Sequence, residues 1–502
     1  MNFQASDNQK RKTLRYLLEG IVDSPALDIL GISSDSRNIN PGDVFFACQG
    51  VNAHGLDFVK QVEAAGAIAI VWDKSTGIPV KSDLPMIGVD SLALRLGYIA
   101  NRWYGAPSEL LKVFGVTGTN GKTTVASLIA QAYGLFNIRC GYIGTLGSGI
   151  DNIRIDGSLT TPPCIEVHQR LAEFRDEGIS HAAIEVSSHG LQQERVNGIK
   201  FNSAIFTNLT RDHLDYHDSI QSYFEVKSRL FLNYEAKNRI VCVDDQFGIK
   251  LAKLCGKDVV RVSTGSSKEI LNSPYVFADS IVLTNSGSEI SIKSSWGLSQ
   301  ISLGLIGDFN VSNALMVLSV LLCEGYDLEE SCNVLGEISP PSGRMQFVGN
   351  HLIENIPRVY VDYSHTPASL EGAINALRSH CKGKIWCVFG CGGDRDKGKR
   401  PLMGKIADRL ADHTIVTTDN PRNERPKSII DEIILGMKGN EVTLEDRAEA
   451  IAYAINRANS EDIVLIAGKG HEKYQIVGDQ RIFFSDSEVA LGCLNDLIGG
   501  AA

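Results

Sequence analysis

The sequence predicts an α/β protein with about three domains, and three observations support this prediction. The chain has 502 residues, whereas a single domain usually has roughly 100–200. Short apolar runs alternate with longer amphipathic segments, which is the pattern of strands and helices in parallel sheets. Turn residues at 105–107 and 340–343 interrupt this alternation. We therefore expect a small mixed α/β N-terminal domain (1–106), a central parallel α/β domain with a β annex (107–342), and a doubly wound C-terminal domain (343–502).

The N-terminal domain is expected to be compact, because its strands and helices are short and closely spaced. Its strands are predicted at 43–48 and 67–72, and its helices at 55–65 and 91–103. The central domain starts with an apolar strand, a Gly-rich turn and a helix. Its strands are predicted at 111–116, 181–186, 201–207 and 239–244, its helices include 122–135 and 311–323, and 259–305 reads as a small antiparallel annex.

The C-terminal domain shows the most regular alternation. Such a doubly wound, Rossmann-like sheet binds ligands beyond the carboxyl ends of its strands. Strands are predicted at 359–363, 384–389, 413–417 and 462–467, and helices at 369–380, 400–411, 426–437 and 448–459.

Composition excludes several classes of protein. With 43% hydrophobic and 22% charged residues, the chain has the balance of globular proteins and not that of collagens, coiled coils or disordered chains. Its 49 Lys and Arg against 59 Asp and Glu give a net charge of −10, which disfavours nucleic acid as a partner. The 11 cysteines follow no metal or disulfide spacing, which indicates reduced thiols.

The lengths of the hydrophobic runs indicate the cellular location of the protein. The first residues contain no apolar core of a signal peptide, and no stretch approaches about 18 uninterrupted apolar residues. We therefore expect a cytoplasmic protein that does not insert into membranes, and we expect it to be a monomer.

The strongest motif lies between the first strand and helix of the central domain, in the segment GVTGTNGKTT at 115–124. Backbone N–H groups of such a turn, together with the helix N-terminus, cradle phosphate oxygens. Lys122 can reach the terminal phosphates and the Thr123 hydroxyl can bind Mg²⁺. The segment departs from the usual P-loop at Val116, where that motif has glycine. We nevertheless predict that this segment is a phosphate-binding loop and that the central domain is a P-loop domain.

Three further polar positions in this domain leave alternatives open. Glu185 ends a predicted strand and is either a Mg²⁺ ligand or a solvated carboxylate. The segment 207–217, which includes His213, is either a metal or acid–base cluster or a polar loop. Lys227 lies on an amphipathic helix, where a surface lysine is the expectation from the residues alone.

Polar segments also follow four predicted strands of the C-terminal domain. They are 361–367, 390–401, 418–422 and 468–472, and the second combines glycines with several cations. This combination suits an anionic ligand, although a solvated basic turn would look the same. On a parallel sheet these four ends share one edge.

Over essentially its whole length the chain resembles the Mur ligases, ATP-dependent enzymes that add amino acids to the UDP-linked peptide precursor of peptidoglycan. The GTNGKT motif at 118–123 is that family's form of the phosphate loop, which accounts for Val116. The resemblance implies three domains in the same order, the cofactors ATP and Mg²⁺, and an acyl-phosphate intermediate. Folylpolyglutamate synthetase, a relative with similar ATP chemistry, is the nearest alternative, and a P-loop hydrolase or switch is an alternative of another class.

The resemblance also implies a role for individual residues. Catalysis would involve Lys122, Glu185, His213 and Lys227, and the metal ligands would be Thr123, Glu185, His213 and a carbamylated Lys227. ATP would be bound by Gly118, Thr119, Asn120, Gly121, Lys122, Thr123, Thr124, Asn310, Arg344 and Asp362. The UDP-sugar peptide would be bound by Ser34, Ser36, Val51, Asn52, Ala53, Thr160, Thr161, Ser187, Gln193 and Arg195.

The segment Asp419-Asn420-Pro421-Arg422 resembles the motif of members that add meso-diaminopimelate to UDP-N-acetylmuramoyl-L-alanyl-D-glutamate. Members that add L-lysine typically lack this arginine. Meso-diaminopimelate is lysine with a second carboxylate at its far end, and a guanidinium pairs with a carboxylate through two parallel hydrogen bonds. Arg395, Gly468 and Glu472 match the other positions around this amino acid. L-lysine stays open as an alternative substrate.

Overall fold

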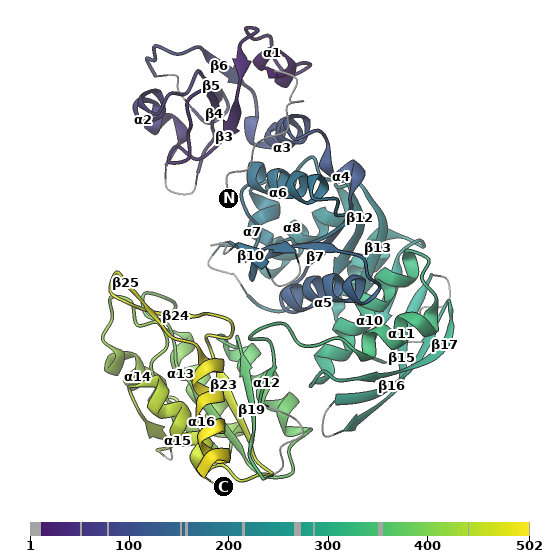
Figure 1. The fold of residues 1–502 in the computed structure, drawn as a ribbon, viewed down its shortest axis with the longest axis vertical. Coiled ribbons are helices and arrows are strands. Elements are labelled where there is room, and N and C mark those ends of the chain that lie inside the picture. Colours follow the sequence, from purple (N-terminus) through teal and green to yellow (C-terminus); the bar gives the residue numbers. More distant parts are fainter. Residues whose placement is uncertain are drawn as a thin grey trace. The chain divides into compact units, whose positions relative to one another are not determined.

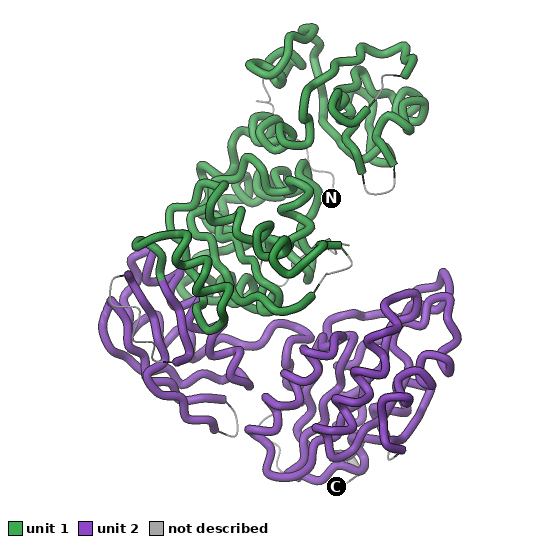
Figure 2. The backbone as a smooth tube through the Cα atoms, turned by 180° about the vertical axis from the view of Figure 1, so that it is seen from behind, with its two compact units in different colours: residues 1–260 green, residues 261–502 purple. Residues whose placement is uncertain are grey.

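A computed structural model describes residues 12–50, 53–77, 80–150, 153–155, 159–212, 216–265, 273–284, 287–349, 355–439 and 441–500. The chain forms two compact units, residues 1–260 and 261–502, which Figure 2 shows in different colours. Each unit contains its own parallel strands, and its helices are amphipathic segments that pack on them.

The first segment of unit 1 is a parallel sheet in the order β3-β4-β5-β6 (Figure 1). Side chains alternate along β4, so Phe45 packs with residues of α2, whereas Val44 and Phe46 pack with residues of α3. Both faces of the sheet are therefore covered. The elements are β1 (Lys12–Thr13), α1 (Leu14–Leu17), β2 (Asp28–Ile29), β3 (Gly31–Ser33), β4 (Asp43–Ala47), η1 (Gly55–Phe58), α2 (Val59–Ala64), β5 (Ala69–Asp73), β6 (Met86–Val89) and α3 (Leu92–Trp103).

The second segment of unit 1 is a sheet in which β8-β11-β7-β12-β13 run parallel, with β9 and β10 added antiparallel beside β8. Strand β7 lies between β11 and β12, so the segments that follow these three strands meet at one edge. The elements are α4 (Pro107–Leu110), β7 (Lys112–Thr117), α5 (Lys122–Leu135), β8 (Cys140–Gly144), β9 (Gly147–Ile150), β10 (Ile153–Ile155), α6 (Cys164–Asp176), β11 (His181–Glu185), α7 (Ser188–Gln192), β12 (Phe201–Phe206), α8 (Ile220–Leu232), β13 (Ala236–Cys242) and α9 (Gln246–Cys255).

Unit 2 begins with the β annex. Strands β15, β16 and β17 form the predicted antiparallel arrangement, but the prediction is wrong for β14, which pairs with β15 in parallel. The helix after the annex starts at Asp308, a few residues before its predicted start. The elements are β14 (Val260–Ser263), β15 (Tyr275–Thr284), β16 (Gly287–Ser294), β17 (Gly297–Leu303), α10 (Asp308–Cys323) and α11 (Leu328–Gly336).

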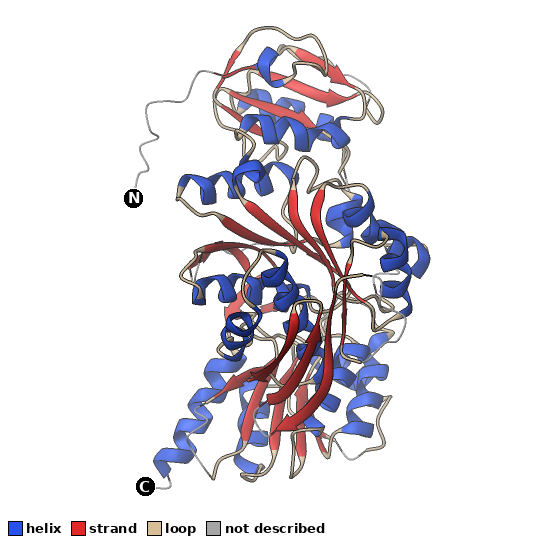
Figure 3. Ribbon diagram, turned by 90° about the vertical axis from the view of Figure 1, so that its right-hand side faces the viewer, coloured by secondary structure: helices blue, strands red, loops and turns tan. Residues whose placement is uncertain are grey.

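The rest of unit 2 is a sheet in the order β18-β19-β23-β20-β21-β22, parallel except for β18. Helices α12, α13 and α14 bury one face, and α15 and α16 bury the other, which confirms the doubly wound prediction (Figure 3). The elements are β18 (Gln346–Val348), β19 (Arg358–Asp362), α12 (Pro367–Arg378), β20 (Ile385–Phe389), α13 (Lys399–Leu410), β21 (His413–Val416), α14 (Pro426–Ile434), β22 (Val442–Thr443), α15 (Arg447–Arg457), β23 (Ile463–Ala467), β24 (Tyr474–Val477), β25 (Gln480–Phe483) and α16 (Asp486–Gly500).

Two other sequence predictions can be compared with the structure. All 11 cysteines are free thiols, as their irregular spacing predicts. In the part of the chain that the structure describes, every helix is too short or too polar to cross a membrane. The predicted fold class, α/β with parallel sheets, is confirmed.

Candidate active site

The phosphate loop lies between β7 and α5, as predicted. Gly118 and Gly121 have positive φ angles of 147° and 84°, which favour glycine. A Cβ on Gly118 would overlap the Thr207 hydroxyl, which donates a 2.6 Å hydrogen bond to the Asn120 carbonyl. Asn208 holds the same loop, because its carbonyl accepts the Thr119 N–H at 2.9 Å. The loop is thus fixed in shape by the end of β12.

Lys122 starts helix α5 and folds back over this loop. Its amine donates to the carbonyl oxygens of Gly118 at 2.9 Å and Thr119 at 2.8 Å. A positive charge therefore lies beside the backbone N–H groups at the start of α5. Together they provide the charge and the donors that bind a phosphate group.

Glu185 ends β11, where its fully buried carboxylate collects hydrogen-bond donors. Thr123 donates to Oε2 at 2.8 Å, and Thr145 donates through its N–H at 2.9 Å and its hydroxyl at 3.1 Å. The Tyr142 hydroxyl also donates to Oε1. Of the alternatives that the sequence left open, the solvated carboxylate is wrong. Tyr142 and Thr145 were not predicted.

The donor set at Glu185 fits a magnesium ion. Carboxylate and hydroxyl oxygens are the ligands that Mg²⁺ prefers, and Thr123 and Glu185 bring two of them together beside the phosphate loop. The side chains and N–H group that donate to this buried carboxylate are all uncharged, so a bound cation would compensate its charge. Among these residues, His, Cys, Asp and Glu form no cluster of three or more that could hold a metal. His213 lies outside the described residues.

Lys227 lies inside the protein, so the expectation of a surface lysine is wrong. Its side chain on α8 is 1% exposed, and its amine donates to the Gly118 carbonyl at 2.7 Å. The amine also lies 4.7 Å from the ring centre of Tyr223. Burial, and then the nearby charge of Lys122, lower the pKa of Lys227 well below its usual range, although Asp212 opposes the shift. This favours the neutral, nucleophilic amine.

The residues expected to bind the UDP-sugar peptide form a connected network beside Glu185. The Thr161 hydroxyl donates to the Glu185 carbonyl at 2.8 Å and accepts the Ser187 N–H at 2.9 Å. Arg195 donates to the Thr161 carbonyl and to Gln193 Oε1, both at 2.6 Å. Thr160 joins the same network, since its hydroxyl oxygen lies 3.2 Å from that of Thr145.

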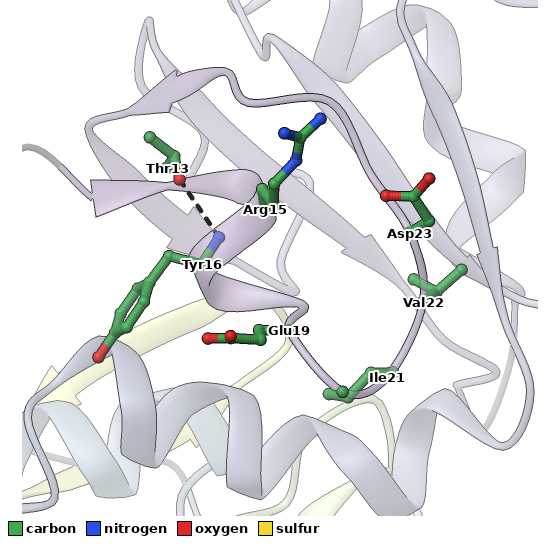
Figure 4. Close-up of a pocket in the computed structure, with 8 residues that line it drawn as sticks. Thr13, Arg15, Tyr16, Glu19, Ile21, Val22 and Asp23 are labelled. Carbon is green, nitrogen blue, oxygen red and sulfur yellow. Dashed lines mark hydrogen bonds between the residues drawn. The ribbon is translucent and has the colours of Figure 1, made fainter.

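The predicted uridine site lies in the first segment of unit 1. Ser34 and Ser36 follow β3, and Ala53 follows β4, its parallel neighbour, so both turns lie at the carboxyl edge of this sheet. Val51 and Asn52 lie outside the described residues. A separate open pocket of about 650 Å³ is lined by Thr13, Arg15, Tyr16, Glu19 and residues 20–23, and no predicted site residue belongs to it (Figure 4).

In unit 2, the sheet order places four polar segments along one edge. Strands β19, β23, β20 and β21 are neighbours in this order, and the predicted segments follow each of them. The prediction that these four ends share an edge is therefore confirmed.

Arg422 is held in an unusual backbone conformation at this edge. Its φ is 50°, in the left-handed region that residues other than glycine seldom adopt. Its N–H donates to Ile476 O at 2.9 Å and its carbonyl accepts from Gly478 at 2.7 Å, so the β24–β25 hairpin fixes this conformation. Nη1 donates to Gly393 O at 2.8 Å, whereas Nε and Nη2 have no protein partner among the described residues.

The other predicted amino-acid contacts surround Arg422. Asn420 donates to Glu472 Oε2 at 2.8 Å, and Asp419 is buried beside Gly468. A Cβ on Gly468 would lie 2.6 Å from Asp419 Oδ2, and the φ of 115° at this position also favours glycine. Pro421 is buried next to Arg422, and Arg395 is exposed within the loop between β20 and α13.

Three residues expected to bind ATP belong to unit 2. Burial raises the pKa of Asp362, whose carboxylate accepts hydrogen bonds from the Ser364 hydroxyl and, at 2.7 Å, the Met345 N–H. The Arg344 guanidinium lies 4.6 Å from the ring centre of Tyr363. Asn310 is buried on α10 and donates to Ile306 O at 2.8 Å.

Comparison with known proteins gives a consistent result. Sequence profiles described as Mur ligase family, catalytic domain, Mur ligase middle domain, and Mur ligase, glutamate ligase domain match residues 28–104, 116–321 and 343–470. The UDP-N-acetylmuramoyl-L-alanyl-D-glutamate--2,6-diaminopimelate ligases of Haemophilus influenzae and Chromobacterium violaceum are 41% and 42% identical, over 92% of this chain and 95% and 94% of theirs. A solved structure of a ligase of the same name is 31% identical, with a TM-score of 0.71 over 97% of this chain and 99% of the other.

Proposed function

The chain belongs to the Mur ligase family, and from this premise we propose how its site works. The protein is an ATP-dependent acid–amino-acid ligase. It adds meso-2,6-diaminopimelate to UDP-N-acetylmuramoyl-L-alanyl-D-glutamate in the synthesis of peptidoglycan precursors. We assign UDP-sugar binding to residues 1–106, ATP binding to 107–342 and amino-acid binding to 343–502, in a cytoplasmic monomer.

The reaction consists of two transfers. The terminal carboxylate of the D-glutamate residue attacks the γ-phosphorus of ATP, giving an acyl phosphate and ADP. The amine of diaminopimelate then attacks the acyl carbon, phosphate leaves, and an amide bond forms. The protein contributes positioning and neutralisation of charge more than covalent chemistry.

Residues 118–124 bind the β- and γ-phosphates, and Lys122 stabilises the charge that develops as the γ-phosphoryl group is transferred. Thr123 and Glu185 would hold one Mg²⁺, and His213 a second, each neutralising phosphate oxygens. Tyr142 and Thr145 orient Glu185 for that purpose, because their hydrogen bonds fix both carboxylate oxygens. Asn310, Arg344 and Asp362 are assigned to adenine, phosphate and ribose.

Lys227 is proposed to be carbamylated, which would turn it into an anionic metal ligand. Carbamylation requires a neutral amine that attacks CO₂, and burial lowers the pKa of Lys227, which raises the share of that form. Its place beside the Gly118 carbonyl puts the product next to the phosphate loop. Burial of an unmodified, charged lysine carries a desolvation cost.

The acceptor substrate binds through two groups of residues. Ser34, Ser36 and the turn 51–53 are assigned to the uridine nucleotide. Thr160, Thr161, Ser187, Gln193 and Arg195 are assigned to the sugar and peptide, because their network adjoins Glu185 and so brings the acceptor carboxylate toward the phosphate loop.

The observation that carries the amino-acid specificity is the geometry of Arg422. Its Nη1 donates to Gly393 O in the loop after β20. The Nε–Nη2 edge of the guanidinium is therefore left for the distal carboxylate of diaminopimelate. A carboxylate accepts two parallel hydrogen bonds from such an edge. L-lysine has no carboxylate there and would leave the arginine without a partner. Arg395, Asp419, Asn420, Gly468 and Glu472 bind the rest of the amino acid.

A ligation assay with purified protein tests this function directly. ATP, Mg²⁺ and UDP-N-acetylmuramoyl-L-alanyl-D-glutamate are supplied with either meso-diaminopimelate or L-lysine, and the product is identified by mass. We expect product and ADP with diaminopimelate, and little with L-lysine. Equal use of L-lysine would refute the role of Arg422. Turnover that needs folate and glutamate, or ATP hydrolysis without any amino acid, would refute the proposed reaction.

A further inference from the structure

Lys469 is a fully buried cation at the amino-acid edge of unit 2. It follows Gly468 after β23, and its side chain is 0% exposed. Its amine donates to Asn420 Oδ1 at 3.3 Å, to Glu472 Oε2 at 3.1 Å, and to the carbonyl of Tyr474. An ammonium group has three protons, so each has an acceptor, as a buried cation requires.

The acceptors of Lys469 are themselves linked. Glu472 Oε2 also accepts Asn420 Nδ2 at 2.8 Å, and Asn420 Oδ1 also accepts the Ile476 N–H at 3.0 Å. Glu472 Oε1, in contrast, has no donor among the described residues. Lys469 and Asn420 together therefore occupy one carboxylate oxygen of Glu472 within the protein, and the other oxygen is left for a ligand.

We propose that Lys469 is a positioning residue for the incoming amino acid, acting through Glu472 and Asn420. This inference rests on the proposed function, in which Glu472 binds diaminopimelate. By holding Oε2, Lys469 turns Oε1 toward the substrate, where it accepts a hydrogen bond from an ammonium group. It also gives Asn420 Oδ1 a second donor beside the Ile476 N–H, which adds to the hold on the Asn420 amide.

The backbone at the ends of β21 and β23 is held by a residue other than Lys469. The role of Lys469 therefore differs from general support of the fold. Arg447, also fully buried, pairs with Asp486 at 2.7 and 2.8 Å. It donates to the carbonyls of Thr418 at 3.3 Å and Ala467 at 3.0 Å, the last residues before Asp419 and Gly468. The backbone at both strand ends is thus held by another cation, whereas Lys469 contacts the side chains of Asn420 and Glu472 and the carbonyl of Tyr474.

The test uses the full-length protein and the variant Lys469→Met, which keeps an unbranched apolar side chain one atom shorter than lysine and cannot donate a hydrogen bond. The Asn420–Glu472 and Asn420–Ile476 hydrogen bonds remain in this variant, so the loops keep their main connections. We expect KM for diaminopimelate to rise about 10- to 100-fold, the effect of one misplaced charge-assisted hydrogen bond. The KM values for ATP and the UDP-linked substrate, and kcat, should stay within about twofold.

A matched control is Val464→Ala, which removes a buried side chain of β23 away from Lys469. It lowers the melting temperature without raising KM for diaminopimelate. Where Lys469→Met melts below the assay temperature, Lys469→Gln is measured in the same way. If the KM for diaminopimelate is unchanged in a folded variant, or changes equally in the control, the inference is overturned.

A double-mutant cycle with Glu472→Gln separates positioning from a direct contact. If Lys469 acts through Glu472, its replacement has little further effect on KM once Glu472 is altered, and strictly additive effects would overturn the inference. The wild-type enzyme shows which proposal has failed. If the wild type ligates diaminopimelate and Lys469→Met does so with normal KM, only the inference fails, whereas a wild type that never uses diaminopimelate refutes the proposed function.

Discussion

Replacing Arg422 with alanine removes the guanidinium edge proposed to bind the distal carboxylate of diaminopimelate. The structure separates this edge from the rest of the side chain, because Nη1 binds Gly393 O while Nε and Nη2 have no described protein partner. The substitution also relieves little of the backbone strain, since alanine at a φ of 50° is disfavoured too. The expected effect therefore comes from the lost substrate contact and from one loop hydrogen bond.

The size of the effect follows from those contacts. Two charge-assisted hydrogen bonds to one carboxylate, partly exposed to solvent, contribute about 3 kcal/mol in total. This corresponds to a fall of about 100-fold in kcat/KM for diaminopimelate. The loop hydrogen bond to Gly393 adds about 1 kcal/mol to the loss of stability. Lysine at this position keeps the charge but loses the planar pair of donors, so we expect an intermediate loss of about tenfold.

The assay measures initial rates of ligation against diaminopimelate and L-lysine, with ATP and the UDP-linked substrate saturating. Arg425→Ala is the matched control, since it removes an exposed arginine only three positions along the chain. Arg422→Ala should lower the preference for diaminopimelate over L-lysine while the KM for ATP is unchanged. A kcat/KM for diaminopimelate within about threefold of the wild-type value would refute the reasoning.

Three other predictions concern unit 1. Lys227→Ala should lower ligase activity about 100-fold, with partial recovery on adding a short-chain carboxylic acid; normal activity without the acid would show that no anionic ligand is needed there. Gly118→Ala should abolish ATP-dependent ligation, because its Cβ overlaps the Thr207 hydroxyl, whereas Gly134→Ala, with open space around its Cβ, should be active; equal activities would contradict the strain argument. Burial lowers the pKa of His168 to about 4, so the unfolded chain takes up a proton that the folded one does not, and about 3 kcal/mol of stability is lost as pH falls from about 6.5 to 4. Chemical denaturation between these pH values should show a smaller loss in the free energy of unfolding for His168→Gln than for the wild type. If the free energies of the two proteins fall in parallel with pH, His168 is not the cause.

Local motifs allowed much of the site to be predicted. The phosphate loop depends on residues close together in the chain, so the spacing of Gly118, Lys122 and Thr123 was sufficient to locate it. The edge of the C-terminal sheet was predictable for a related reason. Parallel strands separated by helices must bring their carboxyl ends together, whatever their order.

Contacts between distant segments were not predictable from the sequence. Tyr142 and Thr145 reach Glu185 only because β8 pairs with β11, and no local pattern states which strands are neighbours. Lys227 looked like a surface residue because amphipathic spacing does not reveal that α8 packs against the phosphate loop. The β24–β25 hairpin, which determines the conformation of Arg422, is short and mostly exposed, so its apolar pattern is weak.

The carbonyl oxygen of Gly118 accepts hydrogen bonds from two lysine amines, Lys122 at 2.9 Å and Lys227 at 2.7 Å. A carbonyl oxygen has two lone pairs, so these amines use its whole accepting capacity. Both amines donate to the same oxygen, so the position of either side chain depends on the other. Replacing either lysine therefore changes the contacts that are open to the other. Single substitutions at positions 122 and 227 will consequently have non-additive effects, and kinetic constants measured for one variant describe both lysines together.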